Sequence, residues 1–333
     1  MGQYIYRTQI SERYCLDFAD APPRLSPSGP MIWRYGKAIG DEKMQQMGAF
    51  YKTAPTGRLG SFQFFRTFFD LFQSQEFANT KKALVFPREY WFPDLQVMVA
   101  RDNEGSTNGF FVAAKGGHNA ESHNHNDIGN FVVYYNGYPL LIDIGSGTYT
   151  AKTFNEHRYE IWSNSSDYHN LPTVNGITQS PGALYKSSNV AYSGNQSFAQ
   201  LTLDISHAYA PSTGISKWQR TVRLNRGKNV DITDEAQLLQ PGKFFQSLMT
   251  CYPAEVTSPG QLVIHYAPAH EKAIDFVIKY DPRQFEASVE KVELLAPEDR
   301  GVQNNWGDSI RRIKLMAASA KSSGKYNMRV SVR

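Results

Sequence analysis

The sequence predicts a mainly β protein: a large antiparallel β-sandwich preceded by a few α-helices. Three observations support this fold class. From about Tyr90 onward, apolar and polar residues alternate with a period of two, in short runs separated by turn residues. Before about Thr80, apolar residues instead recur at the spacing of an amphipathic helix. Aromatic residues make up 13% of the chain, which is typical of β-rich proteins because such side chains pack well on a pleated surface.

The first part of the chain carries start and stop signals for helices. The run MIWRYGKAI ends at Gly40, and Asp41 then has the position of an N-cap for DEKMQQMGAFYK. Ser61 is expected to cap a further helix over 61–79 with a broad aromatic face. We interpret that face as core packing rather than as a row of sugar-binding rings. It comprises Phe62, Phe65, Phe69 and Phe72, with Phe64, Phe68 and Leu71 beside them.

Two prolines in FPREYWFP, Pro87 and Pro93, mark a natural boundary between the helical and the β-rich parts. We therefore expect a helical segment over 1–88 and the sandwich over 89–333. The N-terminus begins directly in helical sequence and has no basic start followed by an apolar run, so it is not a signal peptide. We expect the chain to be part of a longer protein.

The expected strands are bounded by turn residues. Asn136-Gly137 is a strong signal for a two-residue hairpin, because a type I′ turn needs positive φ at both positions. No helix of ordinary length is expected after Thr80. The expected strand runs are 109–115, 129–135, 138–143, 198–206, 217–225, 229–237, 244–252, 261–266, 274–280, 285–295, 309–317 and 326–333.

Composition and motifs exclude several classes of function. The net charge of +4 is too small and too scattered to indicate a nucleic-acid partner, and no run approaches the ~20 apolar residues of a membrane span. Cys15 and Cys251 lie far apart and have no metal-type spacing. The chain contains no nucleotide-binding signature, no GxSxG, no CxxC and no HExxH.

The stretch 115–179 is the most specific part of the sequence, because it holds five of the eight histidines. His123 and His125 form a His-x-His pair, which shares one face if the backbone is extended. The hairpin turn returns Asp143 to the place where the first strand began, so we expect its carboxylate near His125. His169 is the third candidate. Two imidazoles and a carboxylate suit zinc, so the pattern favours a metal site over a hydrogen-bonded polar cluster.

Several assignments in this stretch remain open from the residues alone. Either histidine of the pair can be the metal ligand, and Asp127 is an alternative to Asp143, although it can equally hold a turn. For His118 and His157 we favour exposed or supporting roles. Arg158 is a candidate for binding a substrate carboxylate or sulfate, and it can equally pair with the nearby Glu156 or Glu160.

The segment KGGHNAESHNHNDIGNFVVYYNGYPLLIDIG, followed by TYTAKTF, RYEIW and YHNLPTVNG, resembles the heparinase II/III family of polysaccharide lyases. A weaker likeness covers FPDLQVMVARD, WQRTVRLN and WGDSIRRIKL. The resemblance implies an α/α toroid, of which the first helices here are the end, followed by a β-sandwich. It also implies a bacterial lyase, periplasmic or secreted, that cleaves uronic-acid glycans by β-elimination. Heparin or heparan sulfate would be the substrate, with alginate or another uronate polymer as the alternative.

By this resemblance His123 matches a catalytic histidine that reaches into the cleft. His125, Asp143 and His169 match the ligands of one structural zinc ion. The family's catalytic tyrosine, and the residue that neutralises the substrate carboxylate, come from earlier toroid helices, and nothing in 1–80 matches them. We therefore expect little lyase activity from this chain alone. The alternative is a metal-stabilised sandwich that binds an acidic polysaccharide without cleaving it.

Overall fold

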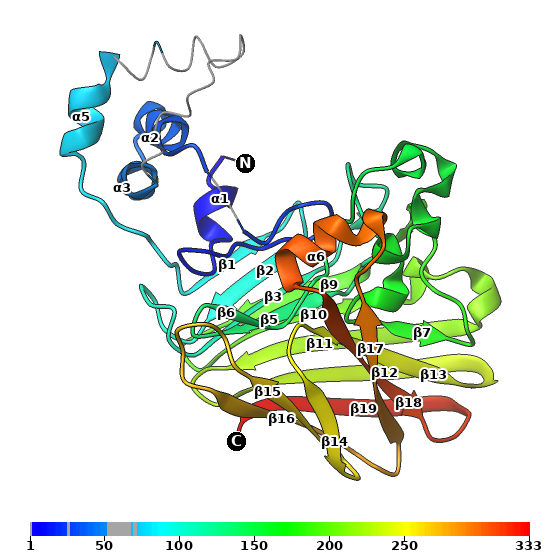
Figure 1. Cartoon of the computed structure of the whole chain (residues 1–333). Coiled ribbons are helices and arrows are strands. Elements are labelled where there is room, and N and C mark those ends of the chain that lie inside the picture. The colour runs from blue at the N-terminus through cyan, green and yellow to red at the C-terminus, as the bar shows by residue number, and fades with distance from the viewer. Residues whose placement is uncertain (1, 25–26, 52–67, 69–71) are drawn as a thin grey trace.

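The structure is a computed structural model, and it describes residues 2–24, 27–51, 68 and 72–333. Within these residues, short helices come first and a large antiparallel β-sandwich follows (Figure 1). The fold class predicted from the sequence is confirmed. None of the helices formed by the described residues is long and apolar enough to span a lipid bilayer.

The early helices begin and end where their capping residues predict. Asp41 caps α3, because its side chain accepts a hydrogen bond from the Met44 backbone N–H at 3.0 Å. Gly40 follows α2 with a φ of 69°, a conformation that glycine adopts without strain. The expected helix over 61–79 falls mostly outside the described residues, and its last part is α5. The helices are α1 (Tyr4–Arg7), α2 (Gly29–Ala38), α3 (Glu42–Phe50), α5 (Ser74–Asn79) and α6 (Arg300–Trp306).

All the strand runs predicted from the sequence form strands, and further strands appear between them. The strands are β1 (Glu89–Phe92), β2 (Val97–Arg101), β3 (Phe110–Lys115), β4 (His118–Asn119), β5 (Phe131–Tyr135), β6 (Tyr138–Leu141), β7 (Pro172–Val174), β8 (Gly182–Lys186), β9 (Ser188–Gly194), β10 (Phe198–Asp204), β11 (Ile215–Asn225), β12 (Asn229–Gly242), β13 (Phe244–Thr250), β14 (Ala254–Ser258), β15 (Gln261–Tyr266), β16 (Ile274–Tyr280), β17 (Phe285–Glu293), β18 (Ser309–Ala317) and β19 (Lys321–Val332).

The described strands pair antiparallel in layered sheets. A five-stranded sheet has the order β1-β2-β3-β5-β6, and an eight-stranded sheet has the order β14-β15-β16-β19-β12-β11-β10-β9. A four-stranded sheet, β17-β18-β13-β7, continues the sandwich, and β4 pairs with β8. The main apolar core lies between the sheets, where inward residues such as Val112, Trp218 and Ile278 are fully buried. The predicted hairpin is also confirmed, since Asn136 and Gly137 join β5 to β6 with φ values of 48° and 80°.

The outer face of the five-stranded sheet is covered as well. Ile10, Leu16 and Phe18 from the N-terminal segment pack there against Val99 and Val132. Helix α6 covers another part of the same face (Figure 1). Both faces of β2 and β3 are consequently buried along their whole length. The domain boundary between residues 88 and 89 stays a prediction, and part of the N-terminal segment packs directly on the sandwich.

Candidate metal centre and adjoining polar cluster

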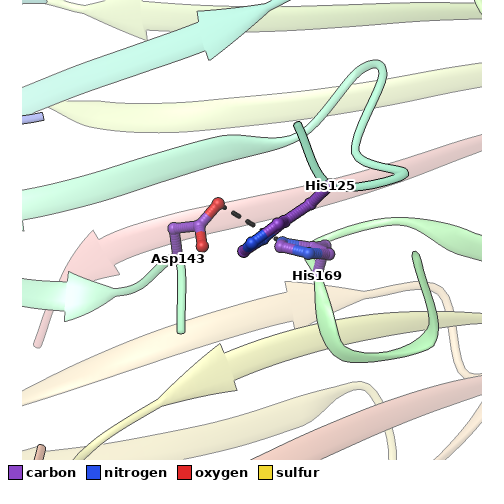
Figure 2. Close-up of side chains that lie close together, drawn as sticks. All are labelled: His125, Asp143 and His169. Carbon is purple, nitrogen blue, oxygen red and sulfur yellow. Dashed lines mark ion pairs between the residues drawn. The ribbon is translucent and has the colours of Figure 1, made fainter. Parts of the chain in front are cut away.

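Three buried side chains from separate loops converge beside the five-stranded sheet. His125 lies in the loop between β4 and β5, Asp143 follows β6, and His169 follows a short 3-10 turn at Ser166–Tyr168. Each offers a ligand atom, and these atoms all lie within 4.8 Å of one another (Figure 2). All three side chains are fully buried. The hairpin therefore brings Asp143 to His125, as the expected register requires.

Asparagines hold the loops that carry these side chains. The Asn130 amide donates to Asp143 Oδ2 at 2.7 Å, and the Gly145 N–H donates to Asp143 Oδ1 at 2.8 Å. Asn170 binds four backbone groups or side chains around it: its N–H donates to Asn130 Oδ1, its amide donates to the carbonyls of Phe131 and Ile142, and its Oδ1 accepts from a backbone N–H of β13. The loops are thus tied to each other and to the sheets.

A buried arginine anchors the same loops to the eight-stranded sheet. Arg220 on β11 is fully buried and makes a bidentate ion pair with Asp234 on β12, at 2.8 and 2.7 Å. Its remaining terminal nitrogen donates to the carbonyls of Gly129 and Asn170, at 3.1 and 2.7 Å. These two carbonyls flank Asn130 and His169 in sequence, so one ion pair fixes the backbone beside two site residues.

The donor set fits a zinc ion. His125 Nδ1 and His169 Nε2 are buried and have no hydrogen-bond partner among the described residues, although a buried polar atom without a partner is costly. Burial alone would raise the pKa of Asp143, but the neighbouring His169 and His125 rings hold it below its usual value. Burial would likewise lower the pKa of His169, but Asp143 raises it. Two nitrogens and a carboxylate oxygen are ligands that zinc commonly takes.

The other candidate residues of the stretch have different partners. Asp127, the alternative ligand, pairs with the buried Lys115 ammonium at 2.7 Å and is not part of the convergent group. His118 Nδ1 accepts a hydrogen bond from the backbone N–H of Ala120. His157 is half exposed and pairs with Glu160. These contacts agree with supporting or surface roles.

His123 lies beside the candidate metal centre, and its side chain is 54% exposed. Its backbone has a φ of 58°, and its Nδ1 lies 3.0 Å from Asp20 Oδ2. The Tyr149 ring stacks near it, with centroids 6.5 Å apart and planes 20° apart. The Tyr149 hydroxyl donates to the same Asp20 oxygen at 2.8 Å. This arrangement presents one imidazole edge and one exposed aromatic ring to solvent.

Arg158 lies close to this cluster. Its NH2 group donates to Asp20 Oδ1 at 2.8 Å, and its other nitrogens donate to the backbone carbonyls of Asn124 and Thr153. The structure therefore pairs Arg158 with Asp20 and not with the sequence neighbours Glu156 or Glu160. Each guanidinium nitrogen of Arg158 already has a partner within the protein. A role for Arg158 in substrate binding stays a prediction.

Sequence reasoning did not single out Asp20, Tyr149, Asn130 or Asn170. Tyr149 and the two asparagines lie within the histidine-rich stretch of the sequence. Their closeness in sequence to the candidate histidines was the one signal that could have identified them. Asp20 belongs to the N-terminal segment, 103 residues before His123. No spacing or motif in the sequence connects these two positions.

Comparisons with known proteins identify the family of this chain and agree with its fold. Residues 88–296 match the family described as heparinase II/III-like, C-terminal. A mutant heparan sulfate lyase from Pedobacter heparinus has a similar structure, with a TM-score of 0.67 and 13% identity. A heparinase III gene product has a TM-score of 0.67 and 14% identity. The matches cover 98% and 99% of this chain but only 45% of either lyase, so the chain spans less than half of their length. At this identity the likeness shows the fold. The search of curated proteins found no match.

Proposed function

Because this chain belongs to the heparinase II/III-like family, whose C-terminal region it matches over residues 88–296, we propose that it is part of a polysaccharide lyase. The proposed substrates are uronic-acid glycans of the heparin or heparan sulfate type, with alginate as the alternative. Such polymers do not cross a cytoplasmic membrane unaided, so the proposal implies a periplasmic or secreted protein. The observation that carries it is the exposed edge of His123, held beside a buried set of metal-ligand residues.

The proposed reaction is β-elimination. A base removes the proton at C5 of the uronate, the C6 carboxylate is neutralised, and an acid protonates the departing O4. The ring of His123 uses Nδ1 for its contacts with Asp20 and Tyr149, which leaves Nε2 for the substrate. His123 then neutralises the carboxylate or transfers a proton. We propose that toroid residues supply the other groups, so this chain alone should show little turnover.

The metal would have a structural role. His125, Asp143 and His169 are the residues that would hold one zinc ion, and the ion would cross-link the three loops that carry them. His123 is two residues from His125, so a fixed position for His125 also limits where the His123 ring can lie. Arg158 would support the cleft wall through Asp20, and direct binding of a substrate carboxylate or sulfate by Arg158 remains part of the proposal.

The test uses the product of the whole gene, with this chain alone in parallel. Each is mixed with heparan sulfate, heparin and alginate, and the absorbance of the unsaturated uronate product is followed. We expect turnover by the whole product, loss of turnover in His123→Ala with an unchanged fold, and normal turnover in His207→Ala, which removes an exposed histidine elsewhere. Glycan binding without turnover by the whole product would refute the lyase proposal and favour a binding sandwich. Rapid turnover by the chain alone would refute the need for toroid residues.

A further inference from the structure

Asp20, on the N-terminal segment, contacts both histidines of the His-x-His pair. Its carboxylate is almost fully buried, and it lies within hydrogen-bond distance of four side chains. We propose that Asp20 is a positioning residue that fixes the ring orientation and the protonated nitrogen of both His123 and His125. The N-terminal segment then completes a site whose other residues come from the sandwich. The part that concerns His123 rests on the proposed function, whereas the part that concerns His125 rests on metal binding alone.

The two oxygens of Asp20 divide the contacts evenly. Oδ1 accepts from His125 Nε2 at 3.0 Å and from Arg158 NH2 at 2.8 Å. Oδ2 accepts from His123 Nδ1 at 3.0 Å and from the Tyr149 hydroxyl at 2.8 Å. An ionised carboxylate can only accept hydrogen bonds, and it has about four lone-pair sites. Four donors therefore use its capacity in full.

These contacts determine which ring nitrogens carry hydrogen. Because Asp20 only accepts, His125 must carry its proton on Nε2 and His123 must carry one on Nδ1. The lone pair of a neutral His125 then lies on Nδ1, which is the buried atom without a hydrogen-bond partner among the described residues. Nδ1 is therefore the atom of His125 that would bind a metal ion. In a neutral His123 the lone pair lies on Nε2, at the exposed edge of the ring.

The charge of Asp20 is held in place by the same donors. The guanidinium of Arg158, which stays charged at ordinary pH, lies 2.8 Å from Oδ1 and favours the ionised form of Asp20. Histidines that bind metals commonly donate their second N–H to a carboxylate, which fixes the ring and makes the ligand more basic. His125 and Asp20 have this arrangement, with the carboxylate supplied from a distant part of the chain.

The backbone around Asp20 is also fixed. The Asp20 N–H donates to the His123 carbonyl at 3.3 Å, so the two segments are joined at backbone and side chain. Ala19, just before it, has a φ of 65°, and Phe18 is packed on the outer face of the five-stranded sheet. The backbone of Asp20 is therefore held in place, and the rings of His123 and His125 must take the orientations that reach its carboxylate.

The experiment compares Asp20→Asn with the wild-type chain in a zinc titration against a chromogenic chelator. Loss of a supporting carboxylate typically weakens metal binding by about 10- to 100-fold, and we expect an effect of that size. Asp275→Asn is the matched control, because Asp275 also pairs with a histidine, His265 at 3.0 Å, and with Arg333 at 3.2 Å. The control should bind zinc as the wild type does.

A second measurement follows the ring nitrogens of ¹⁵N-labelled histidine by NMR in the wild-type chain, so it needs no variant to fold. We expect the Nδ1-protonated form for His123 and the Nε2-protonated form for His125, and both signatures should change in Asp20→Asn. A wild-type His123 protonated on Nε2 overturns the inference, as does an Asp20→Asn chain with unchanged ring signals and unchanged zinc affinity. If the wild-type chain binds no zinc, the metal part of the proposed function is wrong. The NMR signals of the His123 ring nitrogens then still test whether Asp20 fixes the protonated nitrogen of His123.

Discussion

Replacing Arg220 with methionine tests whether the buried ion pair beside the candidate site stabilises the fold. Arg220 is fully buried, and its guanidinium joins Asp234 to the carbonyls of Gly129 and Asn170 and to the side chain of Gln246. Methionine has a similar length but no charge and no donor. The Arg220→Met variant leaves the Asp234 carboxylate buried without its counter-charge.

The expected loss of unfolding free energy follows from this geometry. Removing one partner of a buried ion pair typically costs about 3–5 kcal/mol, because the remaining charge is uncompensated. The carbonyls of Gly129 and Asn170 lose donors as well, at about 1–3 kcal/mol for each group that stays dry. We therefore expect at least about 3 kcal/mol. The double variant Arg220→Met, Asp234→Leu should be less destabilised than the single one, because it removes the unpaired charge.

Urea unfolding followed by tryptophan fluorescence measures these differences. Arg329→Met is the matched control, because Arg329 makes a similar bidentate pair with Asp231 at 2.6 and 3.0 Å on the same sheet but is 55% exposed. The control should lose less than about 1 kcal/mol, since exposed pairs contribute little. If Arg220→Met unfolds within about 1 kcal/mol of the wild type, or if the double variant is the weaker one, our account of this ion pair is wrong.

Three further predictions concern the metal and two peripheral positions. Chelation should lower the melting temperature and added zinc should restore it, because a bound metal at about 100 times its Kd stabilises the folded state by about 2.7 kcal/mol. A melting temperature that chelation leaves unchanged argues against a structural metal. Gly137→Ala should lose more unfolding free energy than Gly105→Ala. Both glycines have positive φ, but only at Gly137 would an added Cβ meet another atom, lying 2.8 Å from Ser11 Cβ. Equal losses of unfolding free energy in urea would contradict this. A hydrogen bond to Asp275 raises the pKa of His265 in the folded protein. The pair of His265 and Asp275 therefore stabilises the fold fully below about pH 6.5, and this stabilisation is lost as the pH rises through the pKa of His265 in the folded protein. Because the pair is exposed, we expect less than about 1 kcal/mol, and His265→Gln should flatten melting temperature against pH across that range.

Most of the strands that the sequence predicted have one face on the core and one face that is more exposed. Runs such as β11 alternate buried and less buried residues along their length, and that alternation is visible in the residue types. The strands β8 and β9 were missed. They have no buried residue, so their sequences do not need apolar residues at alternate positions and do not show that pattern. Strand β2 was missed and shows no alternation, because the N-terminal segment buries its second face. Strand β3 is buried in the same way, and its run of apolar residues was recognised.

The site was predictable where local geometry connects its residues. A two-residue hairpin fixes how far Asp143 returns toward the start of β5, so its proximity to His125 follows from the turn. The partner of Arg158 did not follow, because the acidic neighbours in sequence were available but the folded chain brings Asp20 to it at 2.8 Å. Contacts across such a separation depend on how whole segments pack, which residue types alone do not specify.

The pattern of satisfied and unsatisfied atoms argues for a metal more strongly than the proximity of the three side chains does. Both oxygens of Asp143 accept hydrogen bonds, and the side-chain amides of Asn130 and Asn170 are fully engaged. A polar cluster held only by hydrogen bonds would be expected to use its imidazoles in the same way. Here one nitrogen of each buried ring has no partner among the described residues, and each such nitrogen would cost about 1–3 kcal/mol if left so. A cation bound by both rings would satisfy the two nitrogens together. It would also compensate the charge of Asp143 in a place that water does not reach.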